Sequence, residues 1–349
     1  MRCGFFGERM PSLAFFGRGF AAALFLILAA ICCDSAMAQG LTSSVRALHI
    51  VTRDVAPEDV RARVRLAAGA GYNVLILTLA DGVKFSSFPA SLSTEAWSAD
   101  ALRGIVADAR ALGLDVVPEV KFLTHQELFL KAARADLMFN RVTSKPGHEQ
   151  VQAIQRAHLD EVIRVIQPRA VHIGHDEVAG FSKASRKKWL ESDEPTLPAE
   201  LFEESVKWLH KELTTRGIEV WMWGDMLVAP DEFPGMYERH LHGLPPGYGK
   251  PLRDRLPKDI VICDWHYFDE QAEFPTVSVL RKEGFRVLGS TWKRTETTRN
   301  FAAYAAAHGA QGMIATTWFH VQRKEWDVVD RIIRESGAIF AEHFPDQKN

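Results

Sequence analysis

The chain has 349 residues, of which 47% are hydrophobic and 25% are charged, and its formal net charge at pH 7 is −2. This is the composition of an ordinary globular protein with enough residues for one large core. The near-neutral charge argues against the basic surface by which proteins hold nucleic acid, so we expect no nucleic-acid partner.

The first 38 residues have the three parts of a secretory signal peptide. Arginines at positions 2, 9 and 18 come before an apolar run over residues 20–31, which is too short to span a membrane comfortably. Ala36-Met37-Ala38 is a small-x-small cleavage site before Gln39. We therefore predict a signal peptide over residues 1–38, cleaved near Ala38–Gln39. The mature protein would be secreted or periplasmic, without stable membrane insertion.

Two alternatives for this end stay open. Cys32 would carry the lipid of a lipoprotein, although Ile31 before it is larger than the small residue expected there. A retained leader would act as an anchor helix. Cleavage leaves Cys263 as the last cysteine, in an apolar run where we expect an inert core thiol. No cysteine cluster indicates a metal, and we predict no metal and no cofactor.

The mature chain alternates short apolar segments of β type with amphipathic helical segments. The segments expected to be strands are residues 47–51, 72–79, 114–120, 170–174, 218–223, 260–265, 285–289 and 312–317. The expected helices cover residues 57–70, 98–112, 148–166, 198–216, 276–283, 297–308 and 326–342. Residues 230–257 are rich in Pro, Gly and His, and we expect a long loop between a strand and its helix.

Eight strands, most of them followed by a helix, predict a parallel sheet. In a chain of this length, the α/β pattern fits a (β/α)8 barrel, or TIM barrel, that forms a single domain over residues 41–349. A doubly wound open sheet is the main alternative. No glycine-rich phosphate loop follows the first strand, which disfavours that alternative.

In such barrels the catalytic groups follow the C-terminal ends of the strands. The fourth strand is followed by His175, Asp176 and Glu177. Two adjacent carboxylates repel each other and are costly to desolvate, so their place at a barrel mouth indicates chemistry, with a solvated acidic loop as the simpler alternative. Further candidates after the second, third, fifth and sixth strands are Asp81, His125, Asp225 and Tyr267.

Tryptophans follow four consecutive strands, as Trp223, Trp265, Trp292 and Trp318. Each alone could cap the barrel core, but four at one rim suit a pocket that stacks on the apolar faces of sugar rings. We therefore predict a carbohydrate substrate. Adjacent residues point in different directions, so Asp176 and Glu177 better fit substrate-assisted glycoside hydrolysis than an opposed acid and nucleophile.

At these positions the sequence resembles glycoside hydrolase family 20, the β-N-acetylhexosaminidases, over about residues 44–325. The most specific segment is His172-Ile-Gly-His-Asp-Glu177, which is similar to the family's His-x-Gly-Gly-Asp-Glu. The other matching segments are Asn73-Val-Leu with Asp81 and Phe85, Pro118-Glu119 with His125, Trp223-Gly-Asp225, and Trp318. Arg46, just before the first strand, stands where the family places an arginine that binds sugar hydroxyls.

The resemblance implies a retaining, substrate-assisted enzyme that removes terminal β-linked N-acetylhexosamine. It implies Glu177 as general acid and then base, and Asp176 as the group that orients the 2-acetamido group, with His125 tuning the pair. The residues that would line the sugar pocket are Arg46, Asp81, His125, His175, Trp223, Asp225, Trp265, Tyr267, Trp292 and Trp318.

The chain departs from the family pattern at several positions. His175 replaces a Gly, Thr78 a His, Lys121 an Asp, and His320 the Glu expected after the last Trp. The family's Tyr-Leu-Asp after the seventh strand is missing, which leaves Tyr267 as the candidate to hold the acetamido carbonyl. We expect no N-terminal accessory domain before the barrel.

Three other functions remain as alternatives. The same barrel would act on a sugar without an acetamide if the missing Tyr marks a change of substrate. It would be a carbohydrate-binding protein if catalysis had been lost, although the intact acid pair disfavours this. A metal-dependent hydrolase would use His172, His175 and Asp176, but residues 172 and 175 lie on opposite faces of a regular strand.

Overall fold

The computed structural model describes Met1 and residues 44–88, 93–126, 130–178 and 190–346. Apart from Met1, the predicted signal peptide lies outside the described residues, so its presence and its cleavage stay predictions. The residues from Gly40 to Asn349 make up one compact unit. Within the part of the chain that is described, no helix has the length and apolar character to cross a membrane.

Eight parallel strands close into a barrel in which each strand pairs with the next and β8 pairs with β1. This confirms the predicted (β/α)8 barrel and excludes the open doubly wound sheet. The strands are β1 (Val45–Val51), β2 (Val74–Thr78), β3 (Asp115–Glu119), β4 (Ala170–His172), β5 (Glu219–Trp223), β6 (Val261–Trp265), β7 (Arg286–Thr291) and β8 (Gly312–Thr316).

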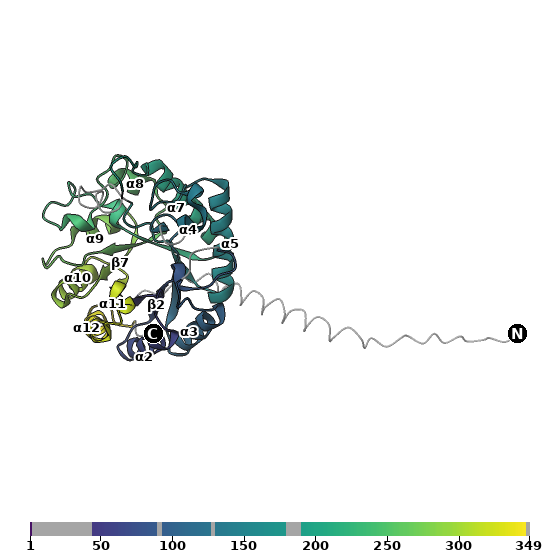
Figure 1. Ribbon diagram of the computed structural model, residues 1–349. Coiled ribbons are helices and arrows are strands. Elements are labelled where there is room, and N and C mark those ends of the chain that lie inside the picture. The colour runs from purple at the N-terminus through teal and green to yellow at the C-terminus, as the bar shows by residue number, and fades with distance from the viewer. Residues whose placement is uncertain (2–43, 89–92, 127–129, 179–189, 347–349) are drawn as a thin grey trace. The chain divides into compact units, whose positions relative to one another are not determined.

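The helices lie around the outside of the strands (Figure 1). The α-helices are α2 (Pro57–Gly69), α3 (Ala99–Ala111), α4 (Leu130–Arg134), α5 (Glu149–Ile166), α7 (Ala199–Thr214), α8 (Lys250–Arg255), α9 (Pro275–Lys282), α10 (Thr295–Ala307), α11 (Trp318–Gln322) and α12 (Trp326–His343). Short 3₁₀ helices are η1 (Ala80–Gly82), η3 (Ala135–Leu137), η4 (Asp225–Leu227) and η5 (Glu238–His240).

Helix α3 shows how the sequence sets the outer layer. Ser98 caps it, because the Ser98 side chain accepts a hydrogen bond from the backbone N–H of Ala101 at 3.1 Å. Its buried residues are Leu102, Ile105, Val106 and Ala109, which share one face at helical spacing. That face packs against the barrel, and the opposite face stays in water.

The barrel closes tightly where β8 meets β1. A Cβ atom on Gly312 would lie 1.9 Å from the carbonyl oxygen of Val45, so this approach of the two backbones requires glycine. All five residues of β2 and of β8 are buried, as expected for strands covered on both faces. The barrel interior is therefore a packed core, and it leaves the strand ends as the place for a site.

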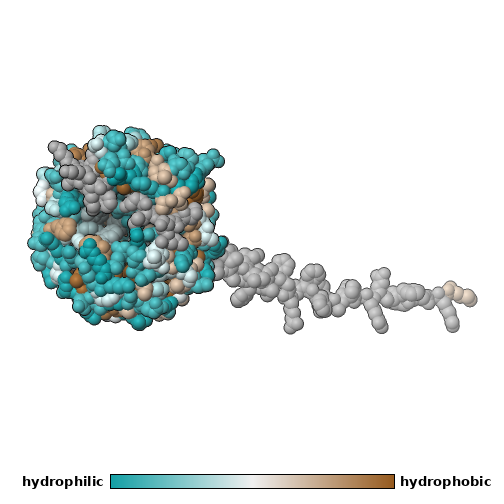
Figure 2. Space-filling view, in the orientation of Figure 1, coloured by the Kyte–Doolittle hydropathy of each residue, from teal (hydrophilic) through white to brown (hydrophobic). Residues whose placement is uncertain are grey.

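The residues expected to form one long loop, 230–257, contain both η5 and α8. Helix α8 begins with Pro251 in its first turn, where proline suits a helix start, so the Pro-rich composition concealed it. The face of the barrel seen in Figure 2 is mostly hydrophilic, with apolar residues in small separate areas. Among the described residues, the exposed large hydrophobic side chains are Met1, Leu112, Tyr237 and Leu244.

Candidate active site

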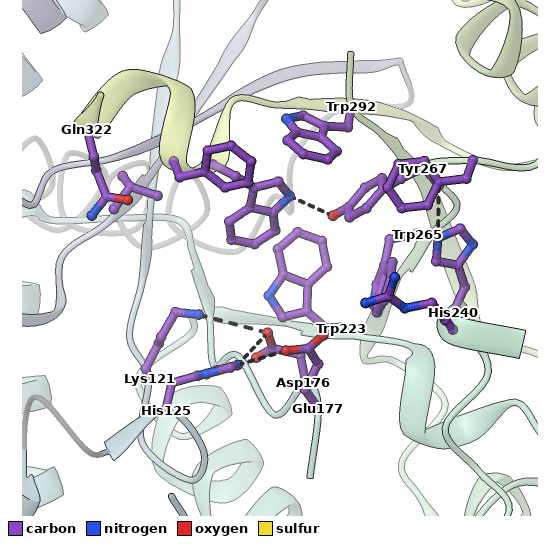
Figure 3. Close-up of a pocket in the computed structure, with 15 residues that line it drawn as sticks. Lys121, His125, Asp176, Glu177, Trp223, His240, Trp265, Tyr267, Trp292 and Gln322 are labelled. Carbon is purple, nitrogen blue, oxygen red and sulfur yellow. Dashed lines mark hydrogen bonds and ion pairs between the residues drawn. The ribbon is translucent and has the colours of Figure 1, made fainter. Parts of the chain in front are cut away.

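A pocket of about 430 Å³ opens at the C-terminal ends of the barrel strands. Asp176 and Glu177, which follow β4, lie on one side of it with His125 from the β3 side (Figure 3). The other predicted residues that line it are aromatic and lie at or just after the C-terminal ends of β5 to β8, as Trp223, Trp265, Tyr267, Trp292 and Trp318. Eight predicted residues thus come together from six strand ends, β3 to β8.

The chain turns sharply after β4, which places the two acids side by side in the pocket. Gly174, His175 and Glu177 have φ angles of 73°, 70° and 49°. This left-handed region costs a non-glycine residue about 1 kcal/mol or more. The end of β5 holds the turn, because the Trp223 N–H donates to the Gly174 carbonyl at 3.1 Å, and the Glu177 N–H donates to Asp225 Oδ2 at 2.8 Å. Such held strain is typical of an active-site turn.

Asp176 is a buried, ionised carboxylate. Its Oδ2 lies 3.1 Å from His125 Nε2 and 3.9 Å from Lys121 Nζ. Burial alone would raise the pKa of Asp176, but the charges of Lys121 and His125 outweigh burial and hold this pKa well below its ordinary value. Oδ1 is buried and has no hydrogen-bond partner among the described residues, so the carboxylate keeps an acceptor for a donor from a ligand.

Glu177 is the more exposed of the two acids, with 30% of its side chain accessible against 10% for Asp176. Its Oε2 lies 3.8 Å from His125 Nε2, so a single imidazole contacts both acids. Burial and the charge of Lys121 lower the pKa of His125, whereas Asp176 and Glu177 raise it, and the pKa ends above its ordinary value. The protonated form of His125 is therefore favoured between the two carboxylates.

A second buried carboxylate, Glu119 at the end of β3, extends this network. Its Oε1 accepts from Trp223 Nε1 at 2.8 Å, and its Oε2 contacts His49 Nε2 at 2.9 Å and accepts from Thr78 Oγ1. Burial would raise the pKa of Glu119, but Lys121 and His49 hold it well below its ordinary value. Lys121 Nζ lies 4.0 Å from Glu119 Oε1 and thus serves two buried carboxylates.

The aromatic wall combines apolar ring faces with a few polar atoms. Trp265 and Tyr267 stack with ring centroids 4.9 Å apart, and Trp318 Nε1 donates to the Tyr267 hydroxyl at 3.0 Å. Burial raises the pKa of Tyr267, so its phenol stays protonated. Trp292 Nε1 is buried and has no hydrogen-bond partner in the described part of the chain. Ring faces with isolated donors suit a sugar, whose own faces are apolar and whose edges are polar.

Asp225 was predicted to line the pocket, but it lies behind the lining and positions it. Oδ2 accepts from the Glu177 N–H and from His242 Nδ1 at 2.6 Å, and Oδ1 accepts from Trp265 Nε1 at 3.1 Å. One carboxylate therefore fixes an acid, an aromatic side chain and a loop.

The prediction that Arg46 contacts the sugar is wrong. Its guanidinium donates to the carbonyls of Gly71 and Phe344 and pairs with Asp346 at 2.6 Å. Arg46 lies near the start of β1, whereas the strand continues to Val51, which lines the pocket. Since the side chain is held at the N-terminal end of the barrel, it stabilises the fold at the end opposite the pocket.

Asp81 does not line the pocket either, contrary to prediction. It is buried and pairs with Arg53 at 3.3 Å, the arginine that follows the C-terminal end of β1. Burial raises the pKa of Asp81, and the charge of Arg53 offsets part of that rise. The sequence analysis missed Arg53, although its position two residues after β1 was a signal.

His175 also points away from the pocket. Its Nε2 lies 3.0 Å from Ser205 Oγ of α7, its Nδ1 lies 2.9 Å from the Ile173 carbonyl, and its ring packs edge-on against Phe202. Burial lowers the pKa of His175 to about 4, so it is neutral. The side chain therefore packs β4 against α7, and the alternative metal site of His172, His175 and Asp176 does not converge.

A different group has the spacing of metal ligands among the described residues, namely His240, His266 and Asp269. Asp269 Oδ2 lies 2.7 Å from His240 Nδ1 and 3.3 Å from His266 Nδ1, and His240 Nε2 accepts from the Tyr267 N–H at 3.4 Å. These contacts join η5 to the segment after β6. We therefore assign this group a structural role, which is to hold η5 against the segment after β6 on this side of the pocket.

The sequence analysis also missed several residues that line the pocket. Phe268 and Phe319 directly follow the predicted Tyr267 and Trp318, so the strand-end rule could have found them. Arg239 and His240 come from η5, inside the stretch expected to be a loop. No periodic pattern marks that stretch, and its path back to the pocket depends on tertiary hydrogen bonds.

Solved structures show which proteins share this fold. A β-N-acetylhexosaminidase from Bacteroides fragilis aligns with a TM-score of 0.60 at 16% identity, over 88% of this chain and 67% of that one. An exo-β-N-acetylglucosaminidase from Vibrio harveyi gives 0.59 at 14%, over 87% and 55%. Dispersin B gives 0.57 at 17%, over 85% and 98%. This chain thus spans about half the length of the Vibrio protein and nearly all of Dispersin B.

These identities show a shared fold, and the sequence itself shows the family. No curated protein sequence matches the chain significantly. Residues 81–334 match the family model described as glycosyl hydrolase family 20, catalytic domain. This match covers most of the chain and includes the acid pair and the tryptophans that follow β5 to β8. The protein therefore belongs to glycosyl hydrolase family 20 and is a glycoside hydrolase.

Proposed function

We propose that this protein removes terminal β-linked N-acetylhexosamine with retention of configuration, using the substrate's own acetamido group as the nucleophile. The observation that carries the proposal is the pair formed by Asp176 and Glu177. One acid is buried and held ionised by two cations, and the other is partly exposed in the pocket. Two carboxylates in such different surroundings suit two different tasks.

Asp176 would orient the acetamide. An amide N–H is a donor, and the carboxylate has spare acceptor capacity at Oδ1. The terminal torsion of an Asp is broad, so a small rotation presents that capacity to the pocket. When the acetamido oxygen bonds to the anomeric carbon, positive charge spreads over the oxazolinium ring. The ionised Asp176 beside its N–H would stabilise that charge.

Glu177 would act first as acid and then as base. In the first step it gives its proton to the glycosidic oxygen as the bond from the anomeric carbon to that oxygen breaks, and the acetamido oxygen forms the new bond. In the second step Glu177 takes a proton from water, which attacks the anomeric carbon and reopens the ring. Its backbone N–H is fixed by Asp225 at 2.8 Å, so the side chain starts from one defined place.

The aromatic wall would hold the sugar. Apolar faces of Trp223, Trp265 and Trp318 offer stacking surfaces, and the buried Trp292 Nε1 offers a donor. Tyr267 would donate to the acetamido carbonyl, because its phenol stays protonated. In this chain the tyrosine that holds the acetamido carbonyl would come from the end of β6. In the family that the sequence resembles, that tyrosine follows the seventh strand.

Paired aryl glycosides test the proposal. Purified protein should hydrolyse an aryl β-N-acetylglucosaminide and leave the matching aryl β-glucoside nearly untouched. Equal hydrolysis of both would favour a glycosidase that ignores the acetamide. Binding of N-acetylglucosamine by calorimetry with no turnover of either substrate would favour a carbohydrate-binding barrel.

We also propose that the chain is exported and cleaved near Ala38–Gln39. The three-part leader supports this. Mass spectrometry of the protein from culture medium or periplasm should find Gln39 at its N-terminus. A protein that retains residues 1–38 in a membrane fraction would contradict cleavage and favour an anchor.

A further inference from the structure

Arg239 is a cation of the pocket that forms no ion pair with an acid among the described residues. It lines the pocket from η5, and its side chain is exposed. Within the described residues, its guanidinium forms no hydrogen bond and no ion pair, whereas Lys121, the other Lys or Arg of the lining, lies 3.9 Å from Asp176 and 4.0 Å from Glu119. The five donors of Arg239 are therefore left for a ligand.

The backbone that carries Arg239 is fixed. Its own carbonyl accepts from His242 Nε2 at 2.7 Å, and the other nitrogen of His242 contacts Asp225 at 2.6 Å. On the other side, Asp269 accepts from the Tyr237 N–H at 2.8 Å and contacts His240 Nδ1 at 2.7 Å. The segment is thus tied to the ends of β5 and β6. A side chain on a fixed backbone loses less entropy when it binds a ligand.

Arg239 would lie on the leaving-group side of the cleaved bond. Asp225 fixes both the Glu177 N–H and His242, so the loop of Arg239 and the proposed general acid share one anchor. A general acid must stand beside the leaving oxygen. The terminal sugar would stack on the buried tryptophans. The exposed Arg239 would contact the next sugar of the substrate.

Other cations stand over the aromatic side chains of the same pocket. Lys293 lies 4.4 Å from the ring centre of Trp292, Arg294 lies 5.2 Å from that of Phe268, and Arg323 lies 4.2 Å from that of Phe319. The acids that line the pocket are Asp176 and Glu177, which would face the reacting sugar. Arg294 is paired with Glu270 at 2.8 Å, and Glu325 lies near Arg323 and Lys293, so these charges are partly neutralised. Arg239 therefore carries most of the attraction for an anion.

We propose that Arg239 selects substrates in which the sugar next to the cleaved bond carries an anionic group, a carboxylate or a sulfate. The inference rests on the proposed function and names its substrate class: acidic glycans that end in β-N-acetylhexosamine. A guanidinium matches both anions through two parallel hydrogen bonds, which a lysine cannot reproduce.

Three disaccharides test this selection. In each, β-N-acetylglucosamine is linked to the 4-position of a second sugar. That second sugar is glucose, glucuronate or glucose 6-sulfate. At low salt, kcat/KM for an anionic disaccharide should exceed that for the neutral one about tenfold, and the ratio should fall as salt rises. The Arg239→Gln variant should bring the ratio close to one, and Arg239→Lys should restore part of it. Arg103→Gln, the same charge change at an exposed position of α3, should keep the ratio.

The outcomes separate this inference from the proposed function. Equal kcat/KM for all three disaccharides in the wild-type protein overturns the anion site and leaves the glycosidase intact. A preference for one anion supports the site and identifies that anion. If no acetamido sugar is hydrolysed, the proposed function fails, and calorimetry with the same disaccharides still decides the inference. Tighter binding of an anionic disaccharide that Arg239→Gln abolishes supports it, and equal affinities overturn it.

Discussion

Lys121 Nζ lies 3.9 Å from Asp176 Oδ2, so the end of β3 supplies the charge that the buried acid after β4 needs. Lys121 also lies 4.0 Å from Glu119, and it contacts the face of Trp318 at 5.7 Å from the ring centre. A residue that first looked like a departure from the family pattern is therefore built into the acid network. Its charge keeps two carboxylates ionised at the base of an aromatic pocket.

Removing that charge should shift the pH dependence of catalysis. Lys121 lowers the pKa of Asp176, so Lys121→Met should raise that pKa and leave more Asp176 protonated at a given acidic pH. The acid limb of kcat/KM against pH should move up by about one pH unit or more. Lys207→Met, an exposed lysine paired with Glu203 on α7, is the matched control and should leave the limb in place. Superimposable limbs for Lys121→Met and the wild type would contradict the role of Lys121.

Replacing the proposed general acid should remove turnover without unfolding the protein. Glu177→Gln keeps the shape of the side chain and its backbone hydrogen bond to Asp225, but it has no proton to give. We expect kcat on an aryl N-acetylglucosaminide to fall about 100-fold to 10,000-fold, measured with circular dichroism as the folding control. Azide, a small external nucleophile that needs no general base, should rescue part of the second step. Retained activity in this variant would remove Glu177 from the mechanism.

Replacing the orienting acid should reduce the rate on acetamido sugars specifically. Asp176→Asn removes the charge that would stabilise the oxazolinium ring, and we expect kcat to fall about 100-fold or more. The dissociation constant for N-acetylglucosamine should change much less, because charge develops only in the transition state. Calorimetry and single-turnover kinetics measure the two effects separately. A loss confined to binding would mean that Asp176 only recognises the ground state.

The group that fixes η5 should make stability depend on pH. Burial would lower the pKa of His266, but Asp264 and Asp269 outweigh burial and raise it to about 9. A raised folded-state pKa stabilises the protein fully below the unfolded value near 6.5, and this contribution is lost as pH rises through 9. The free energy of unfolding should fall by on the order of 3 kcal/mol from this group between those pH values.

Urea denaturation at several pH values measures that slope. His266→Gln should flatten it relative to the wild type, whatever the variant's absolute stability. His308→Gln, at an exposed histidine after α10, should keep the wild-type slope. If His266→Gln and the wild type lose stability in parallel over this range, His266 does not carry the linkage.

The fold could be predicted closely from the sequence, because the periodicity of hydrophobic residues and the residues at strand ends are local signals. The apolar run over residues 170–174 predicted β4, which the structure ends at His172, and the tryptophans at the ends of β5 to β8 marked the rim of the barrel. The helix predicted over residues 98–112 begins at Ser98, which the structure shows to cap α3 and so to pair a backbone donor that the helix itself leaves unpaired. Each of these features depends on neighbours a few residues away.

The predictions were wrong where they had to decide at which end of the barrel a residue lies or in which direction its side chain points. Arg46 is close to β1 in sequence but stands at the end of the strand that faces away from the pocket. His175 lies in the correct turn, yet its φ of 70° turns the side chain towards Ser205 of α7. Arg239 reaches the pocket because its neighbours His242 and Tyr237 hydrogen-bond to Asp225 and Asp269. These long-range contacts have no local sequence pattern that would predict them.

A series of fluorinated acetamides tests acetamido participation most directly. Aryl β-glucosaminides with zero, one, two or three fluorines on the acetyl group differ mainly in the nucleophilicity of the carbonyl oxygen. If that oxygen attacks the anomeric carbon, kcat/KM should fall steeply with each added fluorine. A rate that does not change across the series would contradict substrate assistance, because a carboxylate or water nucleophile would not sense the fluorines.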